Sequence, residues 1–114
     1  MQNSGFAYMI ATRMNHLQAQ RAAATSWKKR RARINTISPG VIVTPLAYDE
    51  FNANGEGYQR MIDASAAQRT GTSDEIAEAA AFLLGEHAKF ITGTDLLIDG
   101  GVIAAIRMGE YQLG

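Results

Sequence analysis

Two short apolar segments, each closed by a turn signal, constrain this sequence more than any other feature. The first, Arg33–Ser38, is anchored by Ile34 and Ile37 and ends at Pro39-Gly40; the second, Asp95–Ile98, ends at Asp99-Gly100-Gly101. Proline cannot donate a ladder hydrogen bond, and glycine accepts the backbone angles of a sharp turn. We therefore expect two strands that are far apart in the sequence.

Helical patterns lie before and between these strands. Asn3 or Ser4 is a candidate N-cap for a long helix over about Phe6–Arg30. After an irregular stretch, Leu46–Gly57, we expect a helix over about Glu56–Ala67. Thr72-Ser73-Asp74-Glu75 is a capping box that opens a third helix, ended by Gly85. The apolar faces are predicted to comprise Ile10, Met14, Leu17, Ala24 and Trp27 in the first helix, Met61 and Ile62 in the second, and Ile76, Ala79, Ala80, Leu83 and Leu84 in the third.

The order helix, strand, helix, helix, strand predicts an α/β fold with two parallel strands joined by a right-handed crossover. Parallel sheets are normally built from several strands and covered on both faces. Two parallel strands with helices therefore indicate the C-terminal portion of a doubly wound parallel sheet. We expect residues 1–114 to form a single partial domain of this kind.

Composition excludes several classes of function. The formal net charge is zero, so no long-range field favours nucleic acid or an anionic membrane. The chain has no cysteine, which rules out disulfides and thiolate metal sites, and the two histidines, His16 and His87, lack metal-ligand spacing. The start of the sequence lacks the pattern of a signal peptide, and no apolar run is long enough to span a bilayer. We expect a cytoplasmic protein that binds no metal, nucleic acid or membrane.

Three motifs follow one another in a familiar order and spacing. They are Arg33–Gly40 continuing into Val41–Pro45, then Gln68–Thr72 running into Ala79–Leu84, and then Phe90–Gly101. These motifs resemble the short-chain dehydrogenase/reductase family, and the resemblance extends from Ala7 to about Ala105. It implies a Rossmann-type fold that lacks the N-terminal nucleotide-binding strands, with their glycine-rich phosphate loop, catalytic serine and structural asparagine.

The resemblance also implies a catalytic residue. In the family, the helix before the first motif opens with Tyr-x-x-x-Lys; here Tyr8 matches the tyrosine, and Thr12 stands at the lysine position. The family's lysine contacts the nicotinamide ribose and lowers the tyrosine pKa, and free tyrosine titrates near ~10. Arg13 lies one residue further on, about 140° from Tyr8 around a helix, and so cannot replace the lysine.

The same resemblance implies part of a cofactor site for NAD or NADP. Pro39, Gly40, Ile42 and Thr44 match the segment that passes under the nicotinamide, and Tyr8 also contacts the cofactor in the family. Ile42 is expected to offer backbone groups to the carboxamide, and Thr44 a hydroxyl to the cofactor. The sequence does not distinguish NAD from NADP, because the discriminating residues belong to the family's N-terminal half.

Other charged residues have plain structural interpretations. Lys28–Arg31 is a phosphate patch or, as we prefer, a set of cations that complements a helix C-terminus. Arg31 stands where similar family members often have the glycine of a left-handed turn. Four carboxylates near the expected substrate lid are predicted to be solvated, namely Asp49, Glu50, Glu56 and Asp63. Asp95 and Asp99 are interpreted as polar caps on a subunit interface.

Two functions remain open at this point. The first is an NAD(P)-dependent oxidoreductase acting on a small carbonyl or alcohol, inactive as an isolated chain because the phosphate loop, serine and lysine are absent. The second is a non-catalytic oligomerisation module derived from such an enzyme. In both, the apolar stripe of the first helix lacks cover, so we expect a homo-oligomer, a dimer or tetramer, that uses the first helix and the last strand.

Overall fold

The computed structural model describes residues 4–40, 42–43 and 55–109. Its helices are α1 (Ser4–Ala24), α3 (Gly55–Ala64), α4 (Ser73–Leu84) and α5 (Val102–Arg107), with short 3-10 turns η1 (Lys28–Arg30) and η2 (Glu86–Ala88). Its strands are β1 (Thr36–Pro39), β2 (Ile42–Val43), β3 (Gly71–Thr72) and β4 (Asp95–Ile98).

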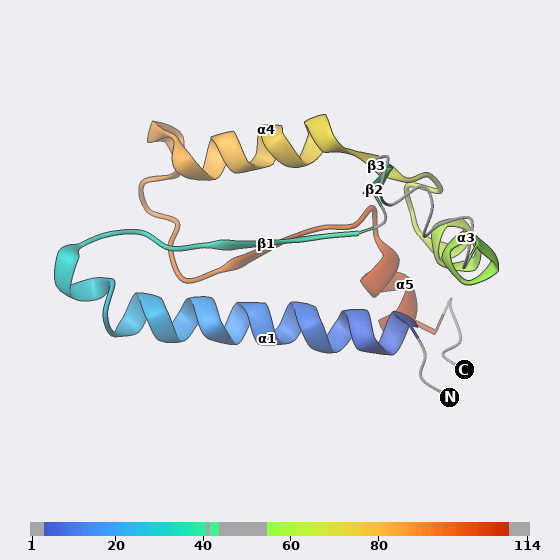
Figure 1. Cartoon of the computed structure of the whole chain (residues 1–114), viewed down its shortest axis with the longest axis horizontal. Coiled ribbons are helices and arrows are strands. Elements are labelled where there is room, and N and C mark those ends of the chain that lie inside the picture. Colours follow the sequence, from blue (N-terminus) through green and yellow to red (C-terminus); the bar gives the residue numbers. More distant parts are fainter. Residues whose placement is uncertain (1–3, 41, 44–54, 110–114) are drawn as a thin grey trace.

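The two expected strands form a parallel pair. Thr36 lies opposite Asp95 and Pro39 lies opposite Ile98, and the pairing ends where the Gly40 amide donates to the Ile98 carbonyl at 2.9 Å. A second parallel pair, which the sequence did not predict, joins β2 to β3. Figure 1 shows α1 along one side of the β1–β4 pair and α4 along the other, so the chain has the predicted α/β layering of a Rossmann-type fold.

The first strand begins later than predicted, at Thr36 and not at Arg33. Side chains make the connection before that point: the Ile34 amide donates to the Thr92 hydroxyl at 3.1 Å, and the Asn35 amide group donates to the Ile91 carbonyl at 3.0 Å. The Asn35 side chain also accepts from the Thr94 amide at 3.2 Å. The Gly93 amide also donates to the Ile34 carbonyl at 2.8 Å, but the other links named here involve side chains, so the two segments are joined without regular strand pairing.

The core lies between α3 and α5, at the end of the molecule where β1 and β4 finish. Met61, Val102 and Ile106 form a buried cluster, with Met9 and Ala64 packed against it. Met61 and Ile62 are both buried, which confirms the inward face predicted for this helix. The sequence did not predict α5, although four of its six residues are buried.

Helix ends also differ from the sequence prediction. α1 ends at Ala24, six residues before Arg30, in a turn where the Thr25 hydroxyl donates to the Arg21 carbonyl at 2.7 Å. α3 ends at Ala64 and not at Ala67 because the buried Ser65 hydroxyl donates to the Ile62 carbonyl at 2.7 Å. Side chains that bond the last carbonyls in this way stop the backbone ladder.

The third helix begins where the capping box predicts. The Thr72 hydroxyl accepts from the Glu75 amide, and the Glu75 carboxylate accepts from the Thr72 amide. Gly85 ends the helix in an extended conformation. Leu83 is buried, but Leu84 is 83% exposed, so its assignment to the inward face was wrong. Adjacent helical residues point about 100° apart, and the buried face takes only one of this pair.

The apolar stripe of α1 faces away from the sheet. Ile10, Met14 and Leu17 are each about half exposed, whereas Ala19 on the inner side of the helix is buried. The Asn15 side chain donates to the Ser38 hydroxyl at 3.2 Å, which ties the inner face of α1 to β1. In the described residues, no helix combines the length and apolar content needed to cross a membrane.

Candidate functional site

The carboxyl ends of β1 and β4 gather the segments that the sequence associates with chemistry. Figure 1 shows both strands running toward the end of the molecule where α1 starts and where α5 and β2–β3 lie. In open α/β sheets, ligands bind in the crevice outside the carboxyl ends of the strands. This end is therefore the candidate functional site.

Tyr8 lies in α1, one helical turn before Thr12. Thr12 is buried, with 9% of its surface exposed, and its hydroxyl donates to the Met9 carbonyl at 2.9 Å. The position of the family's lysine thus holds a neutral side chain whose hydrogen bond stays within its own helix. Arg13 is exposed while its neighbour Thr12 is buried, so the two side chains point to different faces of α1.

Gly40 follows β1 and touches the turn after β4. A Cβ built on Gly40 would lie 2.8 Å from both Cα and Cβ of Asp99. No side chain fits at that distance, so glycine is required here by the packing of the two strand ends. Ile42 lies in β2, opposite Gly71, while Thr44 is outside the residues that the structure describes.

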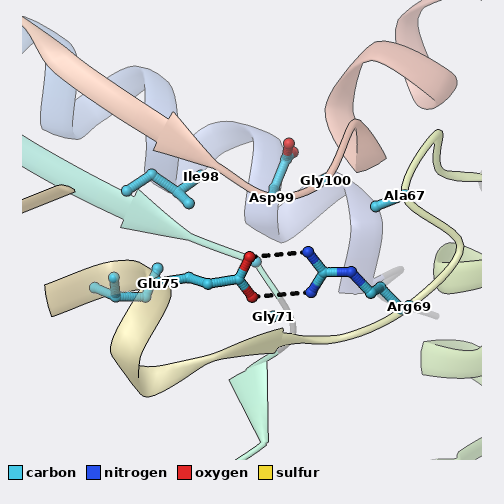
Figure 2. Close-up of a pocket in the computed structure, with 9 residues that line it drawn as sticks. Ala67, Arg69, Gly71, Glu75, Ile98, Asp99 and Gly100 are labelled. Atoms are coloured by element: carbon cyan, nitrogen blue, oxygen red, sulfur yellow. Dashed lines mark hydrogen bonds and ion pairs between the residues drawn. The ribbon is translucent and has the colours of Figure 1, made fainter. Parts of the chain in front are cut away.

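A small pocket opens beside Gly40 (Figure 2). It encloses about 80 Å³. Ligand sites for drug-sized molecules usually enclose roughly 300–1,000 Å³. A pocket of this size among the described residues is too small to enclose a dinucleotide. The residues that line the pocket are Gly40, Ala67, Arg69, Gly71, Glu75, Ile76, Ile98, Asp99 and Gly100.

Two of the lining residues, Arg69 and Glu75, form an ion pair, as Figure 2 shows. Arg69 donates to both oxygens of Glu75, Nη1 to Oε1 at 2.9 Å and Nη2 to Oε2 at 2.8 Å. The hydrogen bond from Arg69 is the main cause that lowers the pKa of Glu75 to about 2. The pair likewise raises the pKa of Arg69. Glu75 therefore stays ionised near neutral pH and is unsuited to proton transfer; it fixes the start of α4 beside the pocket.

Asp99 holds the turn that leads into α5. One carboxylate oxygen accepts from the Gly101 amide and the other from the Ile103 amide, each at 2.9 Å. Asp95 accepts from the Thr36 hydroxyl across the β1–β4 pair. Both aspartates thus have partners within the chain, which the sequence interpretation did not include, and their place at a subunit interface stays a prediction. An aspartate just before an apolar run is a cap signal, which points to α5.

The remaining polar candidates do not join the site. His16 and His87 are exposed, as predicted, and Asp63 is exposed with its carboxylate accepting from Gln59 at 2.8 Å. Asp49 and Glu50 lie outside the described residues. Within residues 4–40, 42–43 and 55–109, no three His, Asp or Glu side chains are grouped as a metal would require.

The cationic run Lys28–Arg31 is exposed at the far end of the molecule from the pocket. Arg31 adopts a left-handed conformation, φ 53° and ψ 31°, and its amide donates to the Lys28 carbonyl at 3.0 Å. The turn that glycine would favour is therefore kept, with arginine in it.

Comparison with known proteins identifies the class to which this fold and site belong. A family model described as enoyl-(acyl carrier protein) reductase matches residues 1–103. The short-chain dehydrogenase/reductase bsc3 of Alternaria brassicicola is 46% identical over 99 residues, which is 86% of this chain and 36% of that protein. The D-threitol dehydrogenase of Mycolicibacterium smegmatis is 36% identical over 80% of this chain and 34% of its own length. The chain therefore belongs to the short-chain dehydrogenase/reductase family, as the motifs indicated.

Solved structures agree with this assignment. A short-chain dehydrogenase family protein from Francisella tularensis superposes on 87% of this chain with a TM-score of 0.68 at 30% identity, over 44% of its own length. A 4-hydroxyisoleucine dehydrogenase complexed with NADH superposes on 76% with a TM-score of 0.65 at 30% identity, over 35% of its own length. The chain spans about a third of the length of the curated relatives that it matches.

Proposed function

We propose that this chain is the tyrosine-bearing part of an NAD(P)-dependent oxidoreductase that interconverts a small carbonyl compound and its alcohol. The observation that carries the proposal is the placement of Tyr8. It lies in α1, whose start is at the carboxyl ends of the two parallel strands, the end that also holds Gly40 and the pocket. The names of the relatives, which are dehydrogenases and reductases, support the same reaction class.

In this proposal the nicotinamide end of the cofactor lies along the segment after β1. The fit extends to this end only, because Pro39 is exposed after the buried Ser38 and the adjacent pocket encloses about 80 Å³. Pro39, Gly40, Ile42 and Thr44 hold the nicotinamide side, and Tyr8 exchanges a proton with the substrate oxygen. The cofactor supplies the hydride. The phosphate-binding loop and the serine come from the N-terminal strands that residues 1–114 do not include. A longer product or a second chain supplies those strands.

Thr12 is the reason to propose that the isolated chain is inactive. A buried hydroxyl that bonds its own helix contributes no positive charge near Tyr8. Without a nearby cation, nothing at this position favours the phenolate form of a tyrosine, as the family's lysine would. Once the missing strands are supplied, Thr12→Lys should raise reductase activity at least tenfold. Equal activity in the two forms would contradict the role given to this position.

A fluorescence titration with NADH and NADPH tests the proposal directly. Saturable binding to the purified chain, lost in a form with a bulky residue at Gly40, would support a cofactor edge on this chain. Tyr8→Phe should abolish any turnover while leaving binding and folding nearly unchanged. Absence of binding up to millimolar cofactor, with the missing strands also supplied, would favour the non-catalytic oligomerisation module.

A further inference from the structure

The turn Asp99-Gly100-Gly101 touches two parts of the molecule that are far apart in the sequence. On one side, Asp99 lies against Gly40, where a Cβ on the glycine would be 2.8 Å from the Asp99 Cα. On the other side, the Ala67 amide donates to the Gly100 carbonyl at 2.9 Å. The turn therefore stands between the segment after β1 and the segment that leaves α3.

Contact with the α3 exit is close enough to exclude side chains. A Cβ on Gly100 would lie 2.9 Å from the Cβ of Ala67, and one on Gly101 would lie 3.1 Å from the Ala66 amide nitrogen. Both glycines also have positive φ angles, +66° and +100°. Two features therefore favour glycine at both positions: the positive φ angle, and the close approach of the Ala67 methyl to Gly100 and of the Ala66 backbone to Gly101.

Further contacts make this junction rigid on both sides. The Asp99 carboxylate accepts from the Gly101 and Ile103 amides and so fixes the turn to the start of α5. On the α3 side, the buried Ser65 hydroxyl donates to Ile62 and accepts from the Gln68 amide at 3.2 Å. Met61 packs on α5 in the core cluster. α3, its exit and α5 therefore form one docked unit.

We propose that the Asp99-Gly100-Gly101 turn is a positioning element, which holds the end of α3 and the segment that leaves it at a fixed place relative to Gly40 and thereby shapes the pocket between them, the space that we assign to the substrate. The pocket supports this because its lining includes Gly40, Ala67, Asp99 and Gly100, which are the residues in contact across the turn. The part of the proposal that concerns substrate rests on the proposed oxidoreductase function. The part that concerns α3 does not.

Gly100→Ala tests the junction, and two other glycines provide matched controls. Gly93 has φ +76° and would place its Cβ 3.0 Å from the Ala23 Cβ on α1, so Gly93→Ala adds a similar strain and contact far from α3. Gly109 has φ +81° and no atom within 4 Å, so Gly109→Ala adds the backbone strain alone. Hydrogen–deuterium exchange of the whole chain is measured for the parent and for each variant.

We expect Gly100→Ala to speed exchange of the amides at the end of α3, around Met61 and Ala64, at least tenfold. The amides of β1 and β4 should change no more than in Gly93→Ala. Adding Ala67→Gly to Gly100→Ala removes the partner methyl and should restore most of the protection of α3. If Gly93→Ala loosens α3 equally, or if Ala67→Gly restores nothing, the junction does not hold α3 and the proposal is wrong.

A milder variant keeps the test decisive if Gly100→Ala fails to fold. Ala67→Val enlarges the other partner at a residue with an ordinary negative φ. It should loosen the end of α3 in the same direction, and unchanged exchange would overturn the proposal.

The catalytic readout is measured on protein to which the missing strands have been supplied. Small carbonyl compounds are first screened with NADH, and the compound with the fastest turnover serves as the substrate. Ala67→Val should then raise KM at least fivefold with kcat within twofold, because Ala67 lines the pocket that the proposal assigns to the substrate. A fall in kcat at unchanged KM would contradict the substrate role. Complete lack of turnover would count against the proposed function, while the exchange experiment would still decide the junction.

Discussion

The two ends of the β1–β4 pair differ in how many close contacts surround the backbone. At the carboxyl end, Gly40, Gly100 and Gly101 each meet a neighbouring segment so closely that a Cβ would lie 2.8 to 3.1 Å from it. At the amino end, Arg31 takes a left-handed turn that a glycine would take without strain, and the Phe90 side chain is fully exposed. The carboxyl end thus holds three such glycines, whereas the amino end holds one, Gly93, whose Cβ would lie 3.0 Å from that of Ala23, and also accepts a strained arginine.

The proposed function offers a reason for this difference. Atoms that react must be held within about 0.5 Å of the productive geometry, and rigid supporting contacts provide that precision. The carboxyl end combines the core cluster Met61, Val102 and Ile106 with the Asp99 turn, and so has such support. The amino end, with Lys28–Arg30 and Phe90 exposed, has much less packing to disturb.

The largest expected effect is a loss of stability, and it is tested by truncating one apolar residue at each end. Ile106→Ala should destabilise the protein by about 2–5 kcal/mol, because it leaves a cavity against Met61 and Val102. Phe90→Ala should change stability by less than about 0.5 kcal/mol, because the ring is exposed. Urea unfolding followed by circular dichroism measures both. Similar losses for the two variants would erase the distinction between the ends.

The sequence predicted the amino-to-carboxyl order of elements well because local signals marked it. β4 has its predicted bounds, Asp95–Ile98, and the capping box places the start of α4. α5 was missed because six residues are too short for a clear helical period, and its buried face exists only through α3. The Gly100–Ala67 contact could not be predicted from local patterns, because it joins residues from separate elements.

Part of the candidate site was predictable from motif positions, and part was not. Tyr8, Gly40 and Ile42 fall at the end of the molecule that the motifs implied, in α1, after β1 and in β2. Their roles remain predictions. Arg69 and Glu75 were not predicted to line the pocket. They flank β3 in the sequence, and they reach Gly40 only because β3 pairs with β2.

A second prediction concerns the face of α1 that runs between the two ends. Ile10, Met14 and Leu17 form an exposed stripe opposite buried Ala19, and we expect it to be covered in a homodimer. Met14→Glu should weaken self-association at least tenfold, which corresponds to about 1.4 kcal/mol. Sedimentation velocity across micromolar concentrations measures the change.

Gln20→Glu provides the control for this experiment, since it adds the same charge to α1 at an exposed position outside the stripe. It should leave association nearly unchanged. A parent protein that sediments as a compact 12.3 kDa monomer at every concentration would refute the homodimer.

A third prediction tests the looser amino end. Arg31→Gly should stabilise the protein by about 1 kcal/mol, because a left-handed residue with a side chain costs roughly 1–2 kcal/mol that glycine avoids. Differential scanning calorimetry should show a melting temperature higher by about 4 °C. Arg30→Gly, one residue earlier in the right-handed 3-10 turn, should lower it instead. An increase in both variants would mean that lost positive charge, and not backbone strain, is the cause.

The smallest expected effect concerns the ion pair at the carboxyl end. The pKa of Glu75 is lowered from its ordinary 4.5 to about 2, chiefly by the hydrogen bond from Arg69. Because the folded-state pKa lies below the unfolded one, the stabilisation is fully present above pH 4.5 and is lost as the pH falls toward 2. Both side chains are about half exposed, at 59% and 42%, so solvent screens most of this interaction.

Glu75→Gln keeps a side chain able to cap the Thr72 amide and removes only the charge. The urea midpoint of the parent should therefore exceed that of Glu75→Gln slightly at pH 6, and the two should converge between pH 4.5 and 2. A constant difference over that range would show that geometry, and not ionisation of Glu75, holds the start of α4 beside the pocket.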